Sequence, residues 1–160
     1  MKKNNLILKA LILIISIQLG AGTVNKSPAD PREYNTFFLK NGIEVITVSD
    51  PELATSAATL SVGVGAFQDP EGAQGIAHFL EHMIFMGSKK YKSPNEYMEF
   101  ISQNGGSTNA FTAAEQTTYL FSINSKQFAP ALDRLSSAIK APLFDGTMVE
   151  KEINAVNSEW

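Results

Sequence analysis

Cysteine is absent from the 160 residues of this chain. Its absence excludes disulfide bonds, zinc sites built from thiolates, a cysteine nucleophile and a lipidated bacterial cysteine. Histidine is nearly as scarce, because the sequence contains only two. A zinc site that uses both histidines must therefore take its remaining protein ligands from carboxylates.

The sequence also has no apolar run long enough to span a membrane, which takes about 20 residues. The longest candidate, Ala10–Leu19, is a largely apolar stretch of 10 residues. Lys2 and Lys3 precede it and the small residues 20–22 follow it, which is typical of a secretory signal. We expect residues 1–22 to be a signal peptide that directs a bacterial protein to the periplasm or out of the cell. The alternative is an uncleaved N-terminal anchor.

A cluster of basic residues is missing as well. Removing residues 1–22 removes three lysines and no acids, which leaves 10 basic against 16 acidic residues and a net charge near −6. An acidic chain of this kind argues against nucleic acid as a partner. The 44% apolar and 18% charged residues are typical of one folded domain with a core. Residues 23–36 are polar and contain two prolines, so we expect an extended lead-in there.

The remaining chain predicts an α+β fold, with a mixed, largely antiparallel sheet and helices packed mainly on one face. The expected strands are 34–39, 43–49, 57–64, 107–112 and 116–124, and the expected helices are 75–87, 95–103, 126–140 and 147 onward. Two capping boxes, Ser93–Glu96 and Thr147–Glu150, predict the starts of the second and fourth helices. The last helical pattern is still running at Trp160, so we expect the sequence to be a fragment.

Both histidines fall in one pentapeptide, residues 78–82, with the sequence HFLEH. Positions four apart share a helix face, so His78 and His82 would point at one spot, and Glu81 leans toward it. Two imidazoles suit zinc, and a carboxylate that is not a ligand suits a base acting on zinc-bound water. Such histidine pairs also occur by chance. However, apolar residues surround most of this helix, which predicts burial, and buried polar groups need partners.

A catalytic zinc ion needs three protein ligands and one open position. With both histidines used, the third ligand must be an aspartate or a glutamate. Glu152 and Glu159 share a face of the last helix, so one could bind the metal while the other holds a ligating histidine. The pattern does not favour Glu159 over Glu150, Glu115 or Asp145, and a solvated acidic face is the simplest alternative.

Four blocks of the sequence resemble the pitrilysin/insulysin family of zinc peptidases, called inverzincins. They are Gly75–Met83 (GIAHFLEHM), Met86–Tyr91 (MGSKKY), Gly105–Thr112 (GGSTNAFT) and Asn154–Glu159 (NAVNSE). Glu159 lies 77 residues after His82 (159 − 82 = 77), which is the separation expected of the family. The similarity runs from about Phe37 to Trp160. It implies that residues 37–160 are the N-terminal part of a zinc metallopeptidase domain.

The resemblance also assigns roles to residues of this chain. It implies one Zn²⁺ ion per site, with Glu81 as the general base and Glu152 as the carboxylate that supports a ligand. The zinc ligands that it implies are His78, His82 and Glu159. The strand edge that it implies for binding an extended peptide is Asn109, Ala110 and Phe111.

The implied function is that of a zinc-dependent metalloendopeptidase, in which Glu81 activates zinc-bound water to hydrolyse extended peptides or small proteins. Members of the family continue far beyond this length and form a closed chamber from paired domains. The expected partners are therefore a peptide substrate and the missing C-terminal domains of the same chain, and the segment alone is expected to be inactive. The alternative is a non-catalytic module for binding or assembly. Metal storage is disfavoured, because only one site can be assembled.

Overall fold

The computed structural model of the protein describes residues 24–159, so the predicted signal peptide lies outside the described residues. The chain divides into two compact units, residues 1–52 and 53–160. None of the helices in residues 24–159 combines the length and the hydropathy needed to cross a bilayer.

The first unit contains a hairpin of the first two expected strands, β1 (Glu33–Phe38) and β2 (Glu44–Ser49). The two strands are antiparallel, with Glu33 opposite Ser49 and Phe38 opposite Glu44. Gly42 lies in the connection with a φ of +87°, a conformation that glycine adopts without steric cost. The turn thus lies between the two expected strands, and β1 begins at Glu33, inside the segment expected to be a lead-in.

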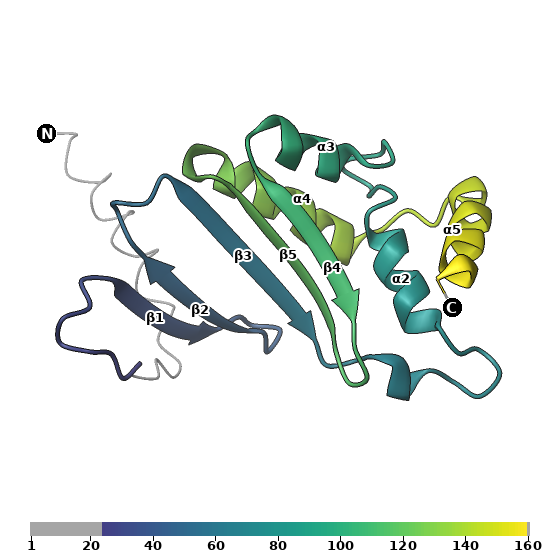
Figure 1. Ribbon diagram of the computed structural model, residues 1–160, viewed down its shortest axis with the longest axis horizontal. Helices are drawn as coiled ribbons and strands as arrows, with labels where there is room; N and C mark the ends of the chain where they lie inside the picture. Colours follow the sequence, from purple (N-terminus) through teal and green to yellow (C-terminus); the bar gives the residue numbers. More distant parts are fainter. Residues whose placement is uncertain (1–23, 160) are drawn as a thin grey trace, which may run out of the picture. The chain divides into compact units, whose positions relative to one another are not determined.

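The second unit is built on a three-stranded antiparallel sheet with the strand order β3-β5-β4 (Figure 1). The strands are β3 (Thr55–Val62), β4 (Ser107–Thr112) and β5 (Thr117–Asn124). β4 and β5 form a hairpin, in which Thr112 faces Thr117. The α+β fold is thereby confirmed, and every strand pairing within residues 24–159 is antiparallel.

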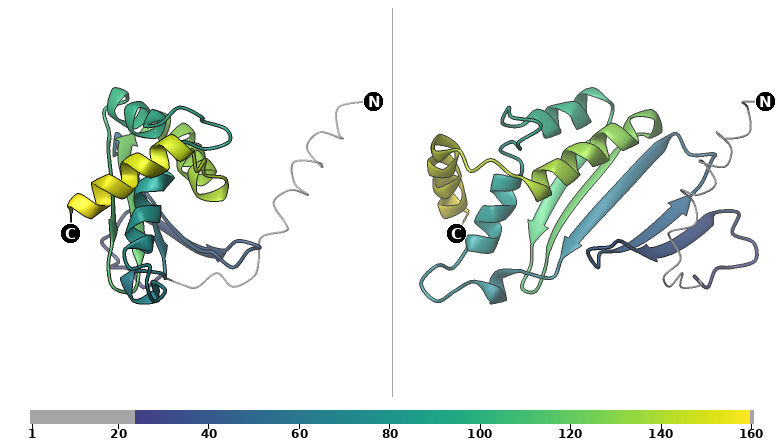
Figure 2. Two further views of the ribbon diagram at one scale, coloured as in Figure 1. Left: turned by 90° about the vertical axis from the view of Figure 1, so that its right-hand side faces the viewer. Right: turned by 180° about the vertical axis from the view of Figure 1, so that it is seen from behind.

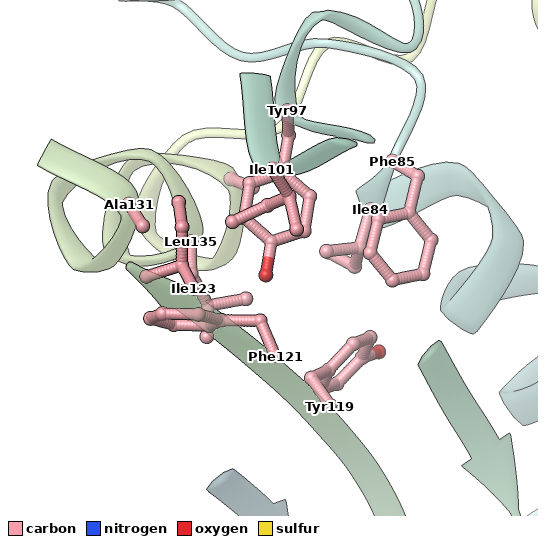
Figure 3. Packing of buried hydrophobic residues seen from close by; sticks show 10 residues of the cluster. Ile84, Phe85, Tyr97, Ile101, Tyr119, Phe121, Ile123, Ala131 and Leu135 are labelled. Atoms are coloured by element: carbon pink, nitrogen blue, oxygen red, sulfur yellow. The ribbon is translucent and has the colours of Figure 1, made fainter. Parts of the chain in front are cut away.

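Helices cover one face of this sheet. They are α2 (Ile76–Ile84), α3 (Glu96–Gln103), α4 (Phe128–Lys140) and α5 (Gly146–Ser158), with 3₁₀ turns η1 (Ala66–Gln68) and η2 (Ser125–Gln127). Alternate residues of β5 point toward the helices, as predicted: Tyr119, Phe121 and Ile123 are buried against side chains such as Ile101 of α3 and Leu135 of α4 (Figure 3). Burying each large apolar side chain stabilises the fold by about 1.5–3 kcal/mol.

The helix starts differ from the predicted capping boxes. α3 begins after Asn95, which has a φ of +64°, and no side chain caps it, so the Ser93 prediction is wrong. α5 begins one residue early because the carboxylate of Asp145 accepts a hydrogen bond from the backbone N–H of Thr147. Aspartate is a strong N-cap residue, so its acceptor replaces the predicted threonine hydroxyl. α5 runs to Ser158, and position 160, where the sequence predicted a helix still running, lies outside the described residues.

α2 is less buried than its apolar pattern predicted. Glu81, Met83 and Ile84 are buried, but Ile76 and Leu80 are 48% and 43% exposed. α2 packs against β4, β5 and α5, and these neighbours leave the stripe containing Ile76 and Leu80 uncovered in the described part of the chain. The expectation of a fully buried helix is therefore wrong for this stripe.

α5 returns to lie beside α2, far from it in sequence (Figures 1 and 2). The loop after α2 pairs with the segment after α4, through a β-bridge between Ser88 and Pro142. Next to the bridge, the backbone N–H of Leu143 donates to the carbonyl of Gly87 at 3.0 Å. We refer to these backbone contacts as the 87–143 clasp. The clasp brings the start of the connection to α5 back to the end of α2.

Candidate metal and catalytic site

The N-terminus of α2, the helix that carries both histidines, is fixed by a carboxylate from the preceding loop. Asp69 accepts hydrogen bonds from the backbone N–H groups of Gly75, at 2.6 Å, and Ala77, at 3.0 Å. Gly75 itself has a φ of +89° and no side chain that could cap the helix. Sequence reasoning did not identify Asp69 as a cap, because it lies six and eight residues before its targets and no adjacent signal marks it.

Three of the predicted residues converge at one point between α2 and the end of α5. His78 Nε2 lies 3.2 Å from His82 Nε2 and 3.3 Å from Glu159 Oε2. His82 Nε2 lies 3.8 Å from the same carboxylate oxygen. Glu159 is the C-cap residue of α5, so the packing of α5 on α2 brings it to the histidines.

These separations fit a single zinc ion. Tetrahedral zinc at about 2.0–2.1 Å from nitrogen and oxygen ligands places neighbouring ligand atoms about 3.3 Å apart. The ligand atoms of His78, His82 and Glu159 all lie within 4.8 Å of one another. Two imidazoles and one carboxylate also form a ligand set used by catalytic zinc, with a fourth position open. In residues 24–159, this is the only such group, so Glu150, Glu115 and Asp145 are not brought to it.

Glu152 supports one of the histidines, on the face of α5 that the sequence indicated. Its Oε2 atom lies 2.9 Å from His82 Nδ1, and both side chains are largely buried. An ionised carboxylate can only accept hydrogen bonds, so Nδ1 donates and carries the ring proton. The lone pair of His82 Nε2 is thereby left for the point shared with His78 and Glu159.

Glu81 points to a different neighbour, the end of β4. Glu81 is only 7% exposed. Its Oε2 atom accepts a hydrogen bond of 2.7 Å from the hydroxyl of Thr112. Burial raises the pKa of nearby Tyr119 to about 12, and the negative charge of Glu81 contributes to this shift. Sequence reasoning did not identify the contact between Thr112 and Glu81, because it joins a helix to a strand 31 residues away.

The predicted peptide-binding residues lie on an edge strand, because β4 pairs only with β5 in the part of the chain that the structure describes. Asn109 and Phe111 are exposed, and Ala110 is half-buried. The backbone N–H of Ala113 donates to the carbonyl of Gln116. Because bonded and non-bonded pairs alternate along an antiparallel ladder, the N–H and C=O of Ala110 point away from β5.

The sequence and fold match known peptidases. The insulinase family, described as peptidase family M16, matches residues 44–160. Human insulin-degrading enzyme is 46% identical over 136 residues, which cover 85% of this chain and 13% of that protein. Protease 3 of Escherichia coli is 41% identical and covers 94% of this chain and 17% of that protein. The crystal structure of pitrilysin superimposes with a TM-score of 0.82 at 42% identity, covering 89% of this chain and 16% of that one.

These similarities define the class of protein as a protease. Human insulin-degrading enzyme and protease 3 are similar to this chain in sequence, and pitrilysin shares its α+β fold. The chain belongs to the insulinase family, peptidase family M16. It spans less than a fifth of the length of the relatives described above.

Proposed function

We propose that this chain is the metal-binding N-terminal part of a zinc-dependent metalloendopeptidase that hydrolyses extended peptides or small proteins. The observation that carries the proposal is the convergence of His78 Nε2, His82 Nε2 and Glu159 Oε2 within 4.8 Å. The buried carboxylate of Glu81 lies on the same helix as both histidines. The family relationship supports peptidase chemistry at this point.

A zinc ion held by these three side chains would supply Lewis acidity and lower the pKa of a bound water toward 7. Glu81 acts as the general base: it takes the proton of the attacking water and passes it to the leaving amine. Glu152 keeps His82 in the tautomer that leaves Nε2 unprotonated. Asn109, Ala110 and Phe111 bind the substrate.

The edge of β4 supports binding of the substrate in an extended conformation. A peptide that adds to this edge bonds the outward N–H and C=O of Ala110, while the exposed side chains of Asn109 and Phe111 flank it. Recognition through the backbone depends on extension more than on side chains. We therefore expect loose sequence specificity, and insulin is a suitable test substrate because a relative is named for degrading it.

The whole activity requires the rest of the protein. Since the chain covers less than a fifth of these relatives, we propose that C-terminal domains of the same protein complete the substrate site and that residues 1–160 alone are inactive. The predicted signal peptide supports a periplasmic or secreted location. One plant relative carries the word peroxisomal in its name, so the family is not confined to one compartment.

The test is a pair of substitutions in the complete protein, with peptide cleavage followed by mass spectrometry and zinc by atomic absorption. Glu81→Gln should abolish cleavage and leave zinc bound, because it removes a base and no ligand. Glu159→Gln should lower zinc occupancy. Glu150→Gln, an exposed position of α5, is the matched control and should change neither quantity.

Two outcomes would contradict the proposal. Full cleavage by Glu81→Gln would remove Glu81 from the mechanism, and full zinc occupancy in Glu159→Gln would remove the third ligand. A zinc-loaded complete protein that cleaves no peptide would favour the alternative, a non-catalytic module for binding or assembly.

A further inference from the structure

The hydroxyl of Thr112 is the hydrogen-bond partner of Glu81, and it comes from the sheet rather than from α2. Thr112 is the last residue of β4, and its Oγ1 atom lies 2.7 Å from Glu81 Oε2. We propose that Thr112 is a positioning residue that holds the carboxylate of Glu81 in the orientation required of the general base. This inference rests on the proposed function, which assigns that role to Glu81.

The direction of the hydrogen bond follows from the neighbouring groups. The Thr117 hydroxyl donates to the carbonyl of Val64 at 2.9 Å, which uses its single proton. It therefore cannot donate to Thr112, whose Oγ1 lies 3.4 Å away. The carboxylate of Glu81 only accepts hydrogen bonds when it is ionised. The proton of Thr112 is thus directed to Glu81.

The supporting residues make this hydroxyl a rigid anchor. Thr112 and Thr117 face each other across the β4–β5 ladder, and threonine is stiff at χ1 because it branches at Cβ. Gly65 lies beneath the same hairpin: a Cβ atom placed there would be 2.2 Å from the carbonyl oxygen of Ala113. The orientation of the carboxylate is therefore set by the end of the hairpin as well as by α2.

The two carboxylate oxygens of Glu81 therefore have different roles. Oε2 is occupied by Thr112, and within residues 24–159 this is the only hydrogen bond that Glu81 makes through its side chain. Oε1 is left to accept the proton during the reaction. Without the hydroxyl, the glutamate can rotate about its side-chain bonds, and small misplacements of a catalytic group reduce rates strongly.

The experiment uses the complete zinc-loaded protein and a fluorogenic peptide. Thr112→Val keeps the shape of the side chain and removes the donor, and we expect kcat to fall about 10- to 100-fold. KM and zinc stoichiometry should stay within about twofold, because neither the substrate edge nor a metal ligand is changed. Thr112→Ser retains the hydroxyl and should recover kcat to within about threefold. Thr112→Ala serves as a second variant if the valine protein does not fold.

Thr108→Val is the matched control. Thr108 lies on the same face of β4, and its hydroxyl bonds the Tyr97 hydroxyl and the Leu120 carbonyl, not Glu81. The same substitution there removes hydrogen bonds of the fold and should leave kcat within about twofold. A fall in kcat equal to that of Thr112→Val would assign the effect to general damage of the strand and overturn the proposal.

A crystal structure of Thr112→Val supplies a readout that does not depend on activity. We expect the Glu81 carboxylate to leave its present position or to occupy two. An unmoved carboxylate, or a Thr112→Val protein with the kcat of the wild type, would overturn the positioning role. If the wild-type protein cleaves nothing, the proposed function fails, and the carboxylate position still decides whether Thr112 orients Glu81.

Discussion

His82 and Glu152 are 70 positions apart in the sequence, yet Nδ1 of the imidazole lies 2.9 Å from Oε2 of the carboxylate. This contact fixes both the ring orientation and the tautomer of His82. Carboxylates in this position also make the histidine a stronger ligand. If the site binds zinc as we propose, the pair links its zinc affinity to a residue that is not itself a ligand.

We predict that Glu152→Ala weakens zinc binding about 10- to 100-fold. Glu152→Gln should weaken binding less, because its amide oxygen can still accept the proton of His82 Nδ1. Competition with a chromophoric zinc chelator measures the affinity of each variant. Equal zinc affinities in the alanine and glutamine variants would contradict a role for Glu152 as a hydrogen-bond acceptor.

Two neighbouring glycines offer a matched test of close packing at the β4–β5 hairpin. A Cβ atom on Gly65 would lie 2.2 Å from the carbonyl oxygen of Ala113 and 2.6 Å from the backbone nitrogen of Gln116. These are backbone atoms that cannot move without distorting the hairpin. At Gly63, a Cβ atom would meet nothing within 4 Å.

We therefore predict that Gly65→Ala lowers the free energy of unfolding by about 1–3 kcal/mol or more, as overpacking does. Gly63→Ala should change it by less than about 0.5 kcal/mol. Urea unfolding followed by circular dichroism measures both. If the two variants were equally stable, the close approach at Gly65 would not be a constraint on the fold.

Alkaline pH should weaken the fold through buried tyrosines. Burial raises the pKa of Tyr119 and of Tyr97 from 10 to about 12. Between these values the unfolded chain releases the phenolic protons and the folded chain keeps them, so stability falls as the pH rises. The stability associated with these two tyrosines is fully present below pH 10 and is lost by about pH 12.

Tyr119→Phe should remove part of this pH dependence, and the double variant with Tyr97→Phe should remove more. The measurement is the urea midpoint at several values between pH 9 and pH 12, where the loss of midpoint should be smaller in the variants. An identical loss in the wild type and in the double variant would show that other groups govern the alkaline transition.

Much of the fold was predictable from local patterns. β4 was predicted at its observed boundaries because Gly105-Gly106 precedes it, and the alternation of Tyr119, Phe121 and Ile123 identified the buried face of β5. The helix caps were less predictable: Asp69 acts six and eight residues before its two targets, and Asp145 caps α5 ahead of the threonine that the capping-box pattern selected.

The site shows the same division. His78, Glu81 and His82 lie within about one turn of helix, so their spacing alone predicted that they belong to one site. The choice of Glu159 over the other carboxylates required family resemblance, because no local rule relates the end of α5 to α2. The contact between Thr112 and Glu81 was missed, since it depends on how a strand end and a helix pack in three dimensions.

The 87–143 clasp has a consequence for the entropy of assembling the proposed metal site. Along the chain, His82 and Glu159 are separated by 77 residues. The clasp provides a shortcut from Gly87 to Leu143, so the flexible path between the two ligands shortens to about 20 residues. Each halving of a loop reduces its closure cost by about 0.6 kcal/mol, so this shortcut makes closure of the site easier by about 1 kcal/mol. The clasp thus raises the effective concentration of Glu159 at the two histidines.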